Sequence, residues 1–400
     1  MIVLFLKLGM GQGTLSFSKK TQTRMKLLTG GQKMNIKSLL LGSAAALAAV
    51  SGAQAADAIV AAEPEPMEYV RVCDAFGTGY FYIPGTETCL KIGGYLRVEW
   101  KGGDVQGTGQ NTFPGGGGDS WNTRTRATLK FSTATDTEYG ALKTYAEVEF
   151  QKDNNNGGST NLAHGYIEFA GFLLGYTDSL FAGGYIGGGY SNNDYILVNY
   201  GDTARNQIRY TYGDTSNGFS FTAGVEDSSD NSGDFLGDSD KVDTYVPNVV
   251  GGMSYSTGGF QAFLVGGYDA VVEEGAIKGR INATFGAFSA YVMAGWNTDG
   301  DYQNDYAQWY GDWAVWLGAK YQFTEKLAIY GDFNFMDQGA TDSDGNFTDA
   351  GKFETSIGLD YAIVPGFKVR PEVSYVADYD QIAGDKAEDW GGMIRFQRDF

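Results

Sequence analysis

The sequence predicts an all-β fold, a 16-stranded antiparallel transmembrane β-barrel. Segments in which apolar and polar side chains alternate recur along residues 91–400, as expected for strands between lipid and water. The connections alternate between short turns and longer loops, which is the sidedness of an outer-membrane barrel. Outside a short apolar run near the start, no stretch could form a transmembrane helix.

The composition favours β-structure and excludes one class of partner. The 400 residues include 59 glycines and 14% aromatic residues, which favour strands joined by many turns. Residues 1–55 carry seven of the 29 basic residues and no acidic one, so the remainder has 22 basic against 48 acidic residues. A chain this acidic, without a basic run, is not expected to bind nucleic acid.

The N-terminal region has the features of an export signal. Residues 34–55 combine a basic start, a short apolar run and the ending Ala53-Gln54-Ala55. This pattern predicts a signal peptide cleaved after Ala55. Residues 1–33 are basic and free of acids, and we interpret them as an upstream extension from an over-long start assignment, with Met34 as the initiator.

Residues 56–90 form a predicted periplasmic leader that contains the only two cysteines, Cys73 and Cys89. In an exported chain an even pair usually forms a disulfide. The loop closed by this bridge has about 15 residues, which is worth about 3 kcal/mol in the chain-entropy model. No histidine lies nearby to complete a zinc site, and no metal site is expected.

The predicted barrel occupies residues 91–400 and closes on residues 390–400. In that last strand Trp390, Ile394, Phe396 and Phe400 share an apolar face, and Arg395, Gln397 and Asp399 share the polar one. Including it, sixteen strands are predicted near residues 95–100, 124–131, 142–150, 164–169, 172–176, 207–212, 219–226, 253–255, 262–268, 277–283, 288–296, 315–323, 327–335, 353–361, 367–375 and 390–400. Two of them are weak. The predicted strand at residues 253–255 is short. In the predicted strand at 262–268, Phe263 and Val265 interrupt the alternation.

Short turns are predicted on one side of the barrel, at residues 136–140, 170–171, 214–218, 256–259, 285–287, 324–326 and 364–366. Most connections on the other side are longer and rich in glycine, asparagine and aspartate, such as 101–120, 226–247 and 336–351. We therefore expect short periplasmic turns, long extracellular loops and both chain ends in the periplasm.

The inward faces predict a water-filled lumen. They carry charged residues that could not be buried in a dry interior: Arg97, Arg124, Arg126, Lys130, Lys143, Glu147, Glu149 and Arg209. Sixteen strands also enclose an aqueous channel rather than a packed core. We therefore expect a passive channel for small hydrophilic solutes and ions that needs no cofactor.

One long loop, residues 182–204, is expected to fold into the lumen as the third loop on its side. Its glycine-rich start, Gly183 to Tyr190, permits tight curvature, and its aromatic residues suit packing against a wall. Its acidic residues Asp194 and Asp202 would then face a basic wall formed by Arg97, Arg124, Arg126, Lys130 and Arg209. Opposed charges at such a pore constriction would create a transverse field that sorts solutes by charge.

Five stretches resemble the alphaproteobacterial outer-membrane porin family of rhizobial type. They are Tyr69 to Leu90, the signal region 34–55, Gly311 to Trp316, Val364 to Phe367 and Arg395 to Arg398. The resemblance covers nearly all of the chain after Met34, and the cysteine segment is its most specific part.

The resemblance implies a homotrimeric, 16-stranded channel in the cell outer membrane, in contact with membrane lipid and lipopolysaccharide. It also implies that Phe400 belongs to the signal read by the outer-membrane barrel assembly machinery. Arg398 departs from the aromatic or apolar residue that many outer-membrane proteins carry two places before the end.

Three other functions are open at this stage. An enzyme is disfavoured because the single histidine, His164, has no nucleophile motif beside it. A surface adhesion or ligand-binding role would use the acidic residues Asp227, Asp230, Asp234, Asp238, Asp240 and Asp243, whose spacing matches no calcium loop. A solute-selective channel, for example for sugars, would differ from a general pore only at the constriction.

Overall fold

The structure is a computed structural model. It describes residues 71–103, 121–154, 157–192, 200–201, 203–228, 245–298, 304–309, 311–338, 351–379 and 386–400. By its contacts the chain divides into Met1–Met67 and Glu68–Phe400, and all described residues belong to the second unit. The predicted signal peptide and the upstream extension lie outside the described residues.

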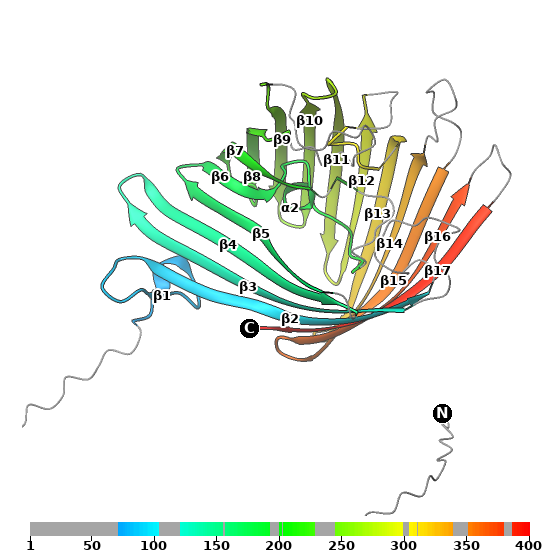
Figure 1. The fold of residues 1–400 in the computed structure, drawn as a ribbon, viewed down its shortest axis with the longest axis horizontal. Helices are drawn as coiled ribbons and strands as arrows, with labels where there is room; N and C mark the ends of the chain where they lie inside the picture. The colour runs from blue at the N-terminus through cyan, green and yellow to red at the C-terminus, as the bar shows by residue number, and fades with distance from the viewer. Residues whose placement is uncertain are drawn as a thin grey trace, which may run out of the picture. The chain divides into compact units, whose positions relative to one another are not determined.

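Within the described residues, sixteen long strands form the wall, and Figure 1 shows them following one another in chain order. They are β2 (Cys89–Gly103), β3 (Trp121–Thr137), β4 (Gly140–Asp153), β5 (Gly158–Phe169), β6 (Phe172–Asp178), β7 (Ala204–Gly213), β8 (Gly218–Glu226), β9 (Asn248–Thr257), β10 (Phe260–Asp269), β11 (Glu274–Phe285), β12 (Phe288–Asn297), β13 (Gly311–Thr324), β14 (Leu327–Gln338), β15 (Gly351–Val364), β16 (Phe367–Tyr379) and β17 (Lys386–Asp399). Every predicted strand is present, including the two weak ones. The short elements are a 3-10 helix (Asp74–Phe76), β1 (Phe81–Tyr82) and α2 (Gly183–Ile186).

The sheet closes on itself. Each strand from β2 to β16 pairs antiparallel with the next one in the chain. β17 then pairs antiparallel with β2, from Gly391 opposite Gly103 to Asp399 opposite Tyr95. Closure satisfies the backbone groups that a sheet edge would leave unpaired in lipid. The prediction of a 16-stranded antiparallel barrel that closes on residues 390–400 is therefore confirmed.

The two faces of the wall follow the period-two pattern of the sequence. In β17 the Trp390 side chain is 61% exposed on the outer face, whereas Arg395 and Gln397 are buried on the inner face. Aromatic rings meet on the outer face, as for Trp100 with Trp121 and Tyr375 with Trp390. This arrangement places an apolar band outside and polar side chains inside.

The seven predicted short turns are all found on one side of the barrel. The longer connections lie on the other side, together with two short ones at residues 154–157 and 270–273. Glycine is required in some of the short turns, for example at Gly258 and Gly286, where φ is +53° and +60°. No helix in the described part of the chain is both long enough and apolar enough to cross a bilayer.

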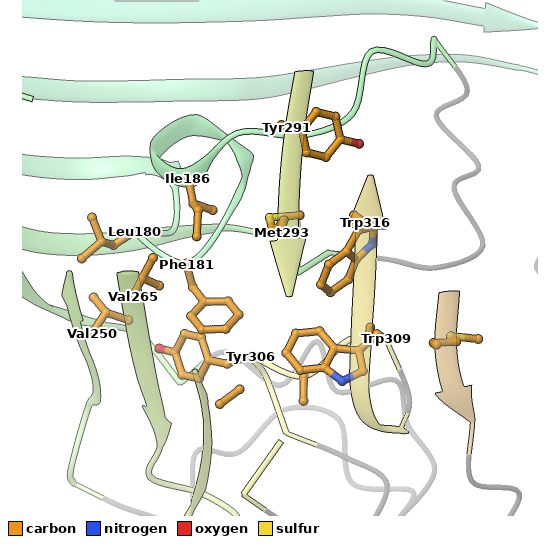
Figure 2. Close-up of a cluster of buried hydrophobic side chains, with 14 residues drawn as sticks. Leu180, Phe181, Ile186, Val250, Val265, Tyr291, Met293, Tyr306, Trp309 and Trp316 are labelled. Carbon is orange, nitrogen blue, oxygen red and sulfur yellow. The ribbon is translucent and has the colours of Figure 1, made fainter. Parts of the chain in front are cut away.

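The interior contains an apolar cluster in addition to polar side chains. Figure 2 shows it where α2 and its neighbours lie against the inner wall. Val265 and Phe263 of β10 face inward and pack there, which explains why the alternation of this strand is interrupted in the sequence. The cluster marks where a connecting loop rests on the wall.

Candidate pore constriction

The four basic residues predicted on β2 and β3 face the lumen, and the three on β3 pair with acidic residues on the neighbouring strand. Arg124 Nε lies 2.9 Å from Asp153 Oδ1, Arg126 Nη1 lies 3.0 Å from Glu149 Oε1, and Lys130 Nζ lies 3.3 Å from Glu147 Oε2. The acidic partners belong to β4, directly across the β3–β4 ladder. This part of the wall is therefore a ladder of paired charges.

Glu99 of β2 joins several basic residues into one cluster. Its side chain has no exposed surface, and its carboxylate lies 2.5 Å from Arg395 Nε. Lys101, Arg124 and Arg97 approach the same carboxylate at 3.5, 3.8 and 3.9 Å. The structure thus brings Arg97 and Arg124 together around a buried acid, and adds Arg395 and Lys101 to them.

Arg209, the fifth predicted wall residue, lies on β7. Its Nη1 donates to the backbone oxygen of Asp178 at 3.3 Å and to Gln207 Oε1 at 3.1 Å. Both contacts are with residues of β6 or β7, and neither is with the cluster at Glu99. The inward His164 of β5 has its Nδ1 3.0 Å from Thr177 Oγ1.

The connection between β6 and β7, residues 179–203, is here named the constriction loop. Its start runs inward along the wall: Leu180, Phe181 and Ile186 are buried in the apolar cluster, and α2 lies against β10. The ring of Tyr185 packs edge-on against Phe263, with centroids 5.7 Å apart. The predicted inward third loop is confirmed.

Further along, the constriction loop rests on two buried acidic residues. Asp332 of β14 accepts hydrogen bonds from the backbone N–H groups of Tyr190 at 3.1 Å and Ser191 at 2.5 Å. Glu372 of β16 accepts from the Asn192 backbone at 2.7 Å and from the Ser191 hydroxyl at 2.8 Å. Burial raises the pKa of the Tyr190 hydroxyl, and the nearby Asp332 carboxylate acts in the same direction.

Basic residues of the wall hold the same segment from other directions. The Arg395 guanidinium donates to both oxygens of Asn192, and Arg370 donates to the Asn192 side chain. On β11, Arg280 donates to the Gly188 backbone oxygen at 2.9 Å, and Lys278 donates to that of Tyr200. The loop is thereby tied to the inner wall from β10 to β17.

The alternation along each strand places five of these residues on the inward face, but it does not show that they hold the loop: Lys278, Arg280, Asp332, Arg370 and Glu372. The period-two pattern gives the direction of a side chain, not the height at which a loop crosses it. The two predicted loop acids, Asp194 and Asp202, lie outside the described residues.

The predicted disulfide between Cys73 and Cys89 is present, with Cα atoms 6.0 Å apart. It ties the segment with the 3-10 helix and β1 to the start of β2, on the short-turn side. A cavity of about 570 Å³ lies there, lined among others by Tyr80, Lys91, Tyr95 and Phe400. The Phe400 backbone exchanges two hydrogen bonds of 3.0 Å with Gly94, which extends the closing ladder to the last residue.

The chain resembles known outer-membrane channels in sequence. A family model described as "Porin subfamily" matches residues 57–394. Porin Omp2b of Brucella suis biovar 1 (strain 1330) is 43% identical over 385 residues, which cover 92% of this chain and all of the relative. Porin Omp2b of Brucella melitensis biotype 1 has the same identity and coverage.

Solved structures share the fold at low sequence identity. The outer membrane channel DcaP of Acinetobacter baumannii has a TM-score of 0.61 at 16% identity and covers 80% of this chain and 99% of its own. An anion-selective porin from Comamonas acidovorans has a TM-score of 0.53 at 13% identity and covers 78% of this chain and 100% of its own.

The closed barrel, the charged lumen and the loop folded into it agree with the family match over residues 57–394 and with the 43% identity to porins over 92% of this chain. This chain belongs to the porin family and forms a channel in the outer membrane.

Proposed function

We propose that this porin is a general diffusion channel, and that its narrowest part lies between the constriction loop and the basic cluster around Glu99. The contact between Asn192 and Arg395 carries this proposal, because it joins the loop to that cluster. Arg395 bonds Asn192 on one side and Glu99 on the other, and Glu99 in turn contacts Arg97 and Arg124.

The constriction loop covers part of the inner wall, so the water path at this level runs along the part that it leaves uncovered. The described part of the loop is bound to inward side chains of β8 and of β10 to β17, which leaves the wall of β2 to β5 for the solute path. That wall carries Arg126 with Glu149 and Lys130 with Glu147 as ion pairs. Side chains of both signs, with Asp194 and Asp202 on the loop, would create a transverse field that favours small polar solutes without a binding pocket for one of them.

Swelling of liposomes that contain the purified protein tests the general-pore proposal. The uptake rate of neutral sugars and amino acids should fall smoothly with solute size and rise linearly with concentration. Saturable uptake of one solute, much faster than that of others of its size, would overturn the proposal in favour of a solute-selective channel. Liposomes with a heat-denatured sample are the control.

Single-channel recordings test the assignment of the constriction. Arg124→Gln and Asp194→Asn should change conductance and ion selectivity in opposite directions, because they remove charges of opposite sign from the two sides. If both variants match the wild type, the constriction lies elsewhere.

We also propose a homotrimer. The trimer form of OmpT, an outer membrane protein of Vibrio cholerae, has a TM-score of 0.52 and covers 79% of this chain and 100% of its own at 13% identity. The expected result is a detergent-purified complex with three times the mass of the mature chain, whose conductance closes in three equal steps. A complex with the mass of one chain and a single closing step would contradict it.

The same proposal includes a role for Phe400 in insertion by the barrel assembly machinery into a membrane of lipid and lipopolysaccharide. The Phe400 side chain is 65% exposed at the end of the closing strand, where a recognition factor could reach it. Phe400→Ala should lower the amount of heat-modifiable barrel in the outer membrane, while Phe400→Tyr should preserve it. Equal amounts for wild type and Phe400→Ala would exclude this role.

A further inference from the structure

A second connection also enters the barrel. Residues 304–309, between β12 and β13, are here named the clamp segment. The side chains of Tyr306 and Trp309 have no exposed surface, and Asn304, Asp305 and Ala307 are buried as well. A connection on the loop side of a barrel would ordinarily be solvated, so this burial needs a reason.

The aromatic rings of the clamp segment pack on the base of the constriction loop. The Phe181 ring lies with its centroid 5.4 Å from that of Tyr306 and 6.3 Å from that of Trp309 (Figure 2). Trp309 in turn packs edge-on against Trp316 of β13 at 5.6 Å. Phe181 is therefore enclosed by rings that belong to a different connection of the barrel.

Glycines on the inner wall provide the space for these rings. A Cβ on Gly267 of β10 would lie 2.5 Å from the Tyr306 ring, and one on Gly295 of β12 would lie 2.8 Å from the Trp309 ring. Neither site could accept even an alanine unless the ring moved. The neighbouring Gly266 points to the outer face, where a Cβ would meet other atoms only at 3.7 Å or more.

Polar contacts connect the same two segments. Glu226 of β8 accepts hydrogen bonds from the Ser179 hydroxyl at 2.8 Å, the Leu180 backbone at 3.1 Å and the Tyr306 hydroxyl at 3.1 Å. One buried carboxylate thus joins the start of the constriction loop to the clamp segment. Removing any donor would leave part of a buried charge without its partner.

The adjacent Asp305 anchors the clamp segment to the wall. Its carboxylate forms an ion pair with Arg205 of β7 at 2.9 Å and accepts from the Asn248 side chain at 2.8 Å. Its backbone N–H donates to Asp269 of β10 at 2.9 Å. Three strands therefore hold one short segment, which fixes its position relative to the loop.

We propose that the clamp segment is a positioning element for the constriction loop, and that Tyr306 and Trp309, seated over Gly267 and Gly295, keep the loop against the wall while the channel is open. This inference rests on the proposed role of the loop as the constriction. Release of the clamp segment frees the loop base to move across the lumen, which interrupts the current.

Two pairs of variants separate this role from simple barrel stabilisation. Gly267→Ala displaces the Tyr306 ring, and Gly266→Ala adds the same methyl group to the same strand on the outer face. Tyr306→Ala removes the ring, and Tyr306→Phe keeps the ring but removes the hydroxyl that donates to Glu226. Each variant is first checked for a heat-modifiable, folded barrel and for its thermal unfolding temperature.

Single-channel recordings at a fixed voltage should show brief closures about tenfold more often in Gly267→Ala and Tyr306→Ala than in the wild type, the change that about 1.4 kcal/mol produces. The closure frequency of Tyr306→Phe should lie between that of Tyr306→Ala and that of the wild type. The closure frequency of Gly266→Ala should match that of the wild type. If folded Gly267→Ala and Tyr306→Ala close no more often than Gly266→Ala, the inference is overturned, whether or not their unfolding temperature falls.

This result can be distinguished from failure of the proposed constriction. If the proposed constriction is wrong, Arg124→Gln and Asp194→Asn would also leave conductance and selectivity unchanged. Normal closures in the clamp variants together with altered selectivity in Arg124→Gln would reject only the clamp. If Gly267→Ala does not fold, Tyr306→Ala against Tyr306→Phe provides the same comparison without adding an atom to the wall.

Discussion

Arg395 of the closing strand donates two hydrogen bonds to Asn192 of the constriction loop, one to the side-chain oxygen at 2.9 Å and one to the backbone oxygen at 2.7 Å. The same guanidinium is paired with Glu99 at 2.5 Å. The strand that closes the barrel therefore also fixes the loop at Asn192. Both contacts are buried, so their loss is not compensated by water.

Asn192→Ala should loosen the constriction loop around residue 192. The change removes the side-chain acceptor of Arg395 and the side-chain donor to Tyr330, which lie at 2.9 and 2.5 Å. We expect larger fluctuations of the open-channel current, measured in planar bilayers, with an assembled barrel of normal amount. Asn217→Ala, in an exposed short turn, is the control. Equal noise in both variants would show that Asn192 does not hold the loop.

Arg124→Gln should shift the ion selectivity toward cations. Arg124 is paired with Asp153 and approaches Glu99, so its loss leaves two carboxylates with one cation fewer in the lumen. The reversal potential across a salt gradient measures the shift. Arg398→Gln removes an exposed guanidinium at the short-turn rim, where it donates to the Pro365 backbone oxygen, and should leave the potential near the wild-type value. Identical potentials for Arg124→Gln and the wild type would place Arg124 outside the solute path.

Reduction of the disulfide should loosen the segment before β2 without opening the barrel. The bridge joins Cys73 to Cys89 across 16 positions, a constraint of about 3 kcal/mol in the chain-entropy model. The β2–β3 ladder includes Cys89 only through its backbone, so a Cys73→Ser, Cys89→Ser double variant keeps the ladder. Limited trypsin cleavage at Arg71 should become faster, while the barrel stays heat-modifiable. The oxidised and reduced wild type provide the matched comparison, and equal cleavage rates would contradict the prediction.

The mature chain should begin at Ala56. The pattern of residues 34–55 predicts cleavage after Ala55. N-terminal sequencing of protein purified from outer membranes checks this directly. A mature protein that begins elsewhere would correct the boundary, and peptides from residues 1–33 in whole-cell digests would contradict their interpretation as an upstream extension.

The wall of the barrel was predictable because lipid and water impose a period of two on each strand. Trp390 and Arg395 reveal the outer and inner faces of β17 without any knowledge of its neighbours. The exceptions carried information as well. Phe263 and Val265 interrupt the pattern of β10 because their inner face is covered by the constriction loop and not by water.

The partners of the inward charges could not be predicted in the same way. Arg124 pairs with Asp153 because the register of β3 and β4 sets them opposite each other, and alternation alone does not fix a register. Likewise Asp332 and Glu372 hold the loop because of the path its backbone takes between them. Glycines that lie beneath aromatic rings, such as Gly267, can be recognised in the sequence. Glycine weakens the interior of a strand, so its presence there indicates that another group approaches the backbone closely.

Acidification should stabilise the clamp segment in its position against the inner wall, here called the seated state. Burial raises the pKa of the Asp305 carboxyl to about 6, against an ordinary value of 3.8, although Arg205 acts in the opposite direction. Once the segment is released into water, its pKa returns toward the ordinary value. The seated state then binds the proton more tightly, so its stability is greatest at low pH and declines as the pH rises through about 6.

Between pH 7 and pH 5 the frequency of brief closures should therefore fall. The charged and titratable groups that face Asp305 are Arg205 of β7, Glu226 of β8, Asp269 of β10 and Tyr306 beside it. Asp305→Asn carries no titrating carboxyl, so its closure frequency should be constant over this range. Asp214→Asn, in a short turn on the opposite side, should keep the wild-type profile. A pH profile that persists in Asp305→Asn would contradict the assignment of the effect to this carboxyl.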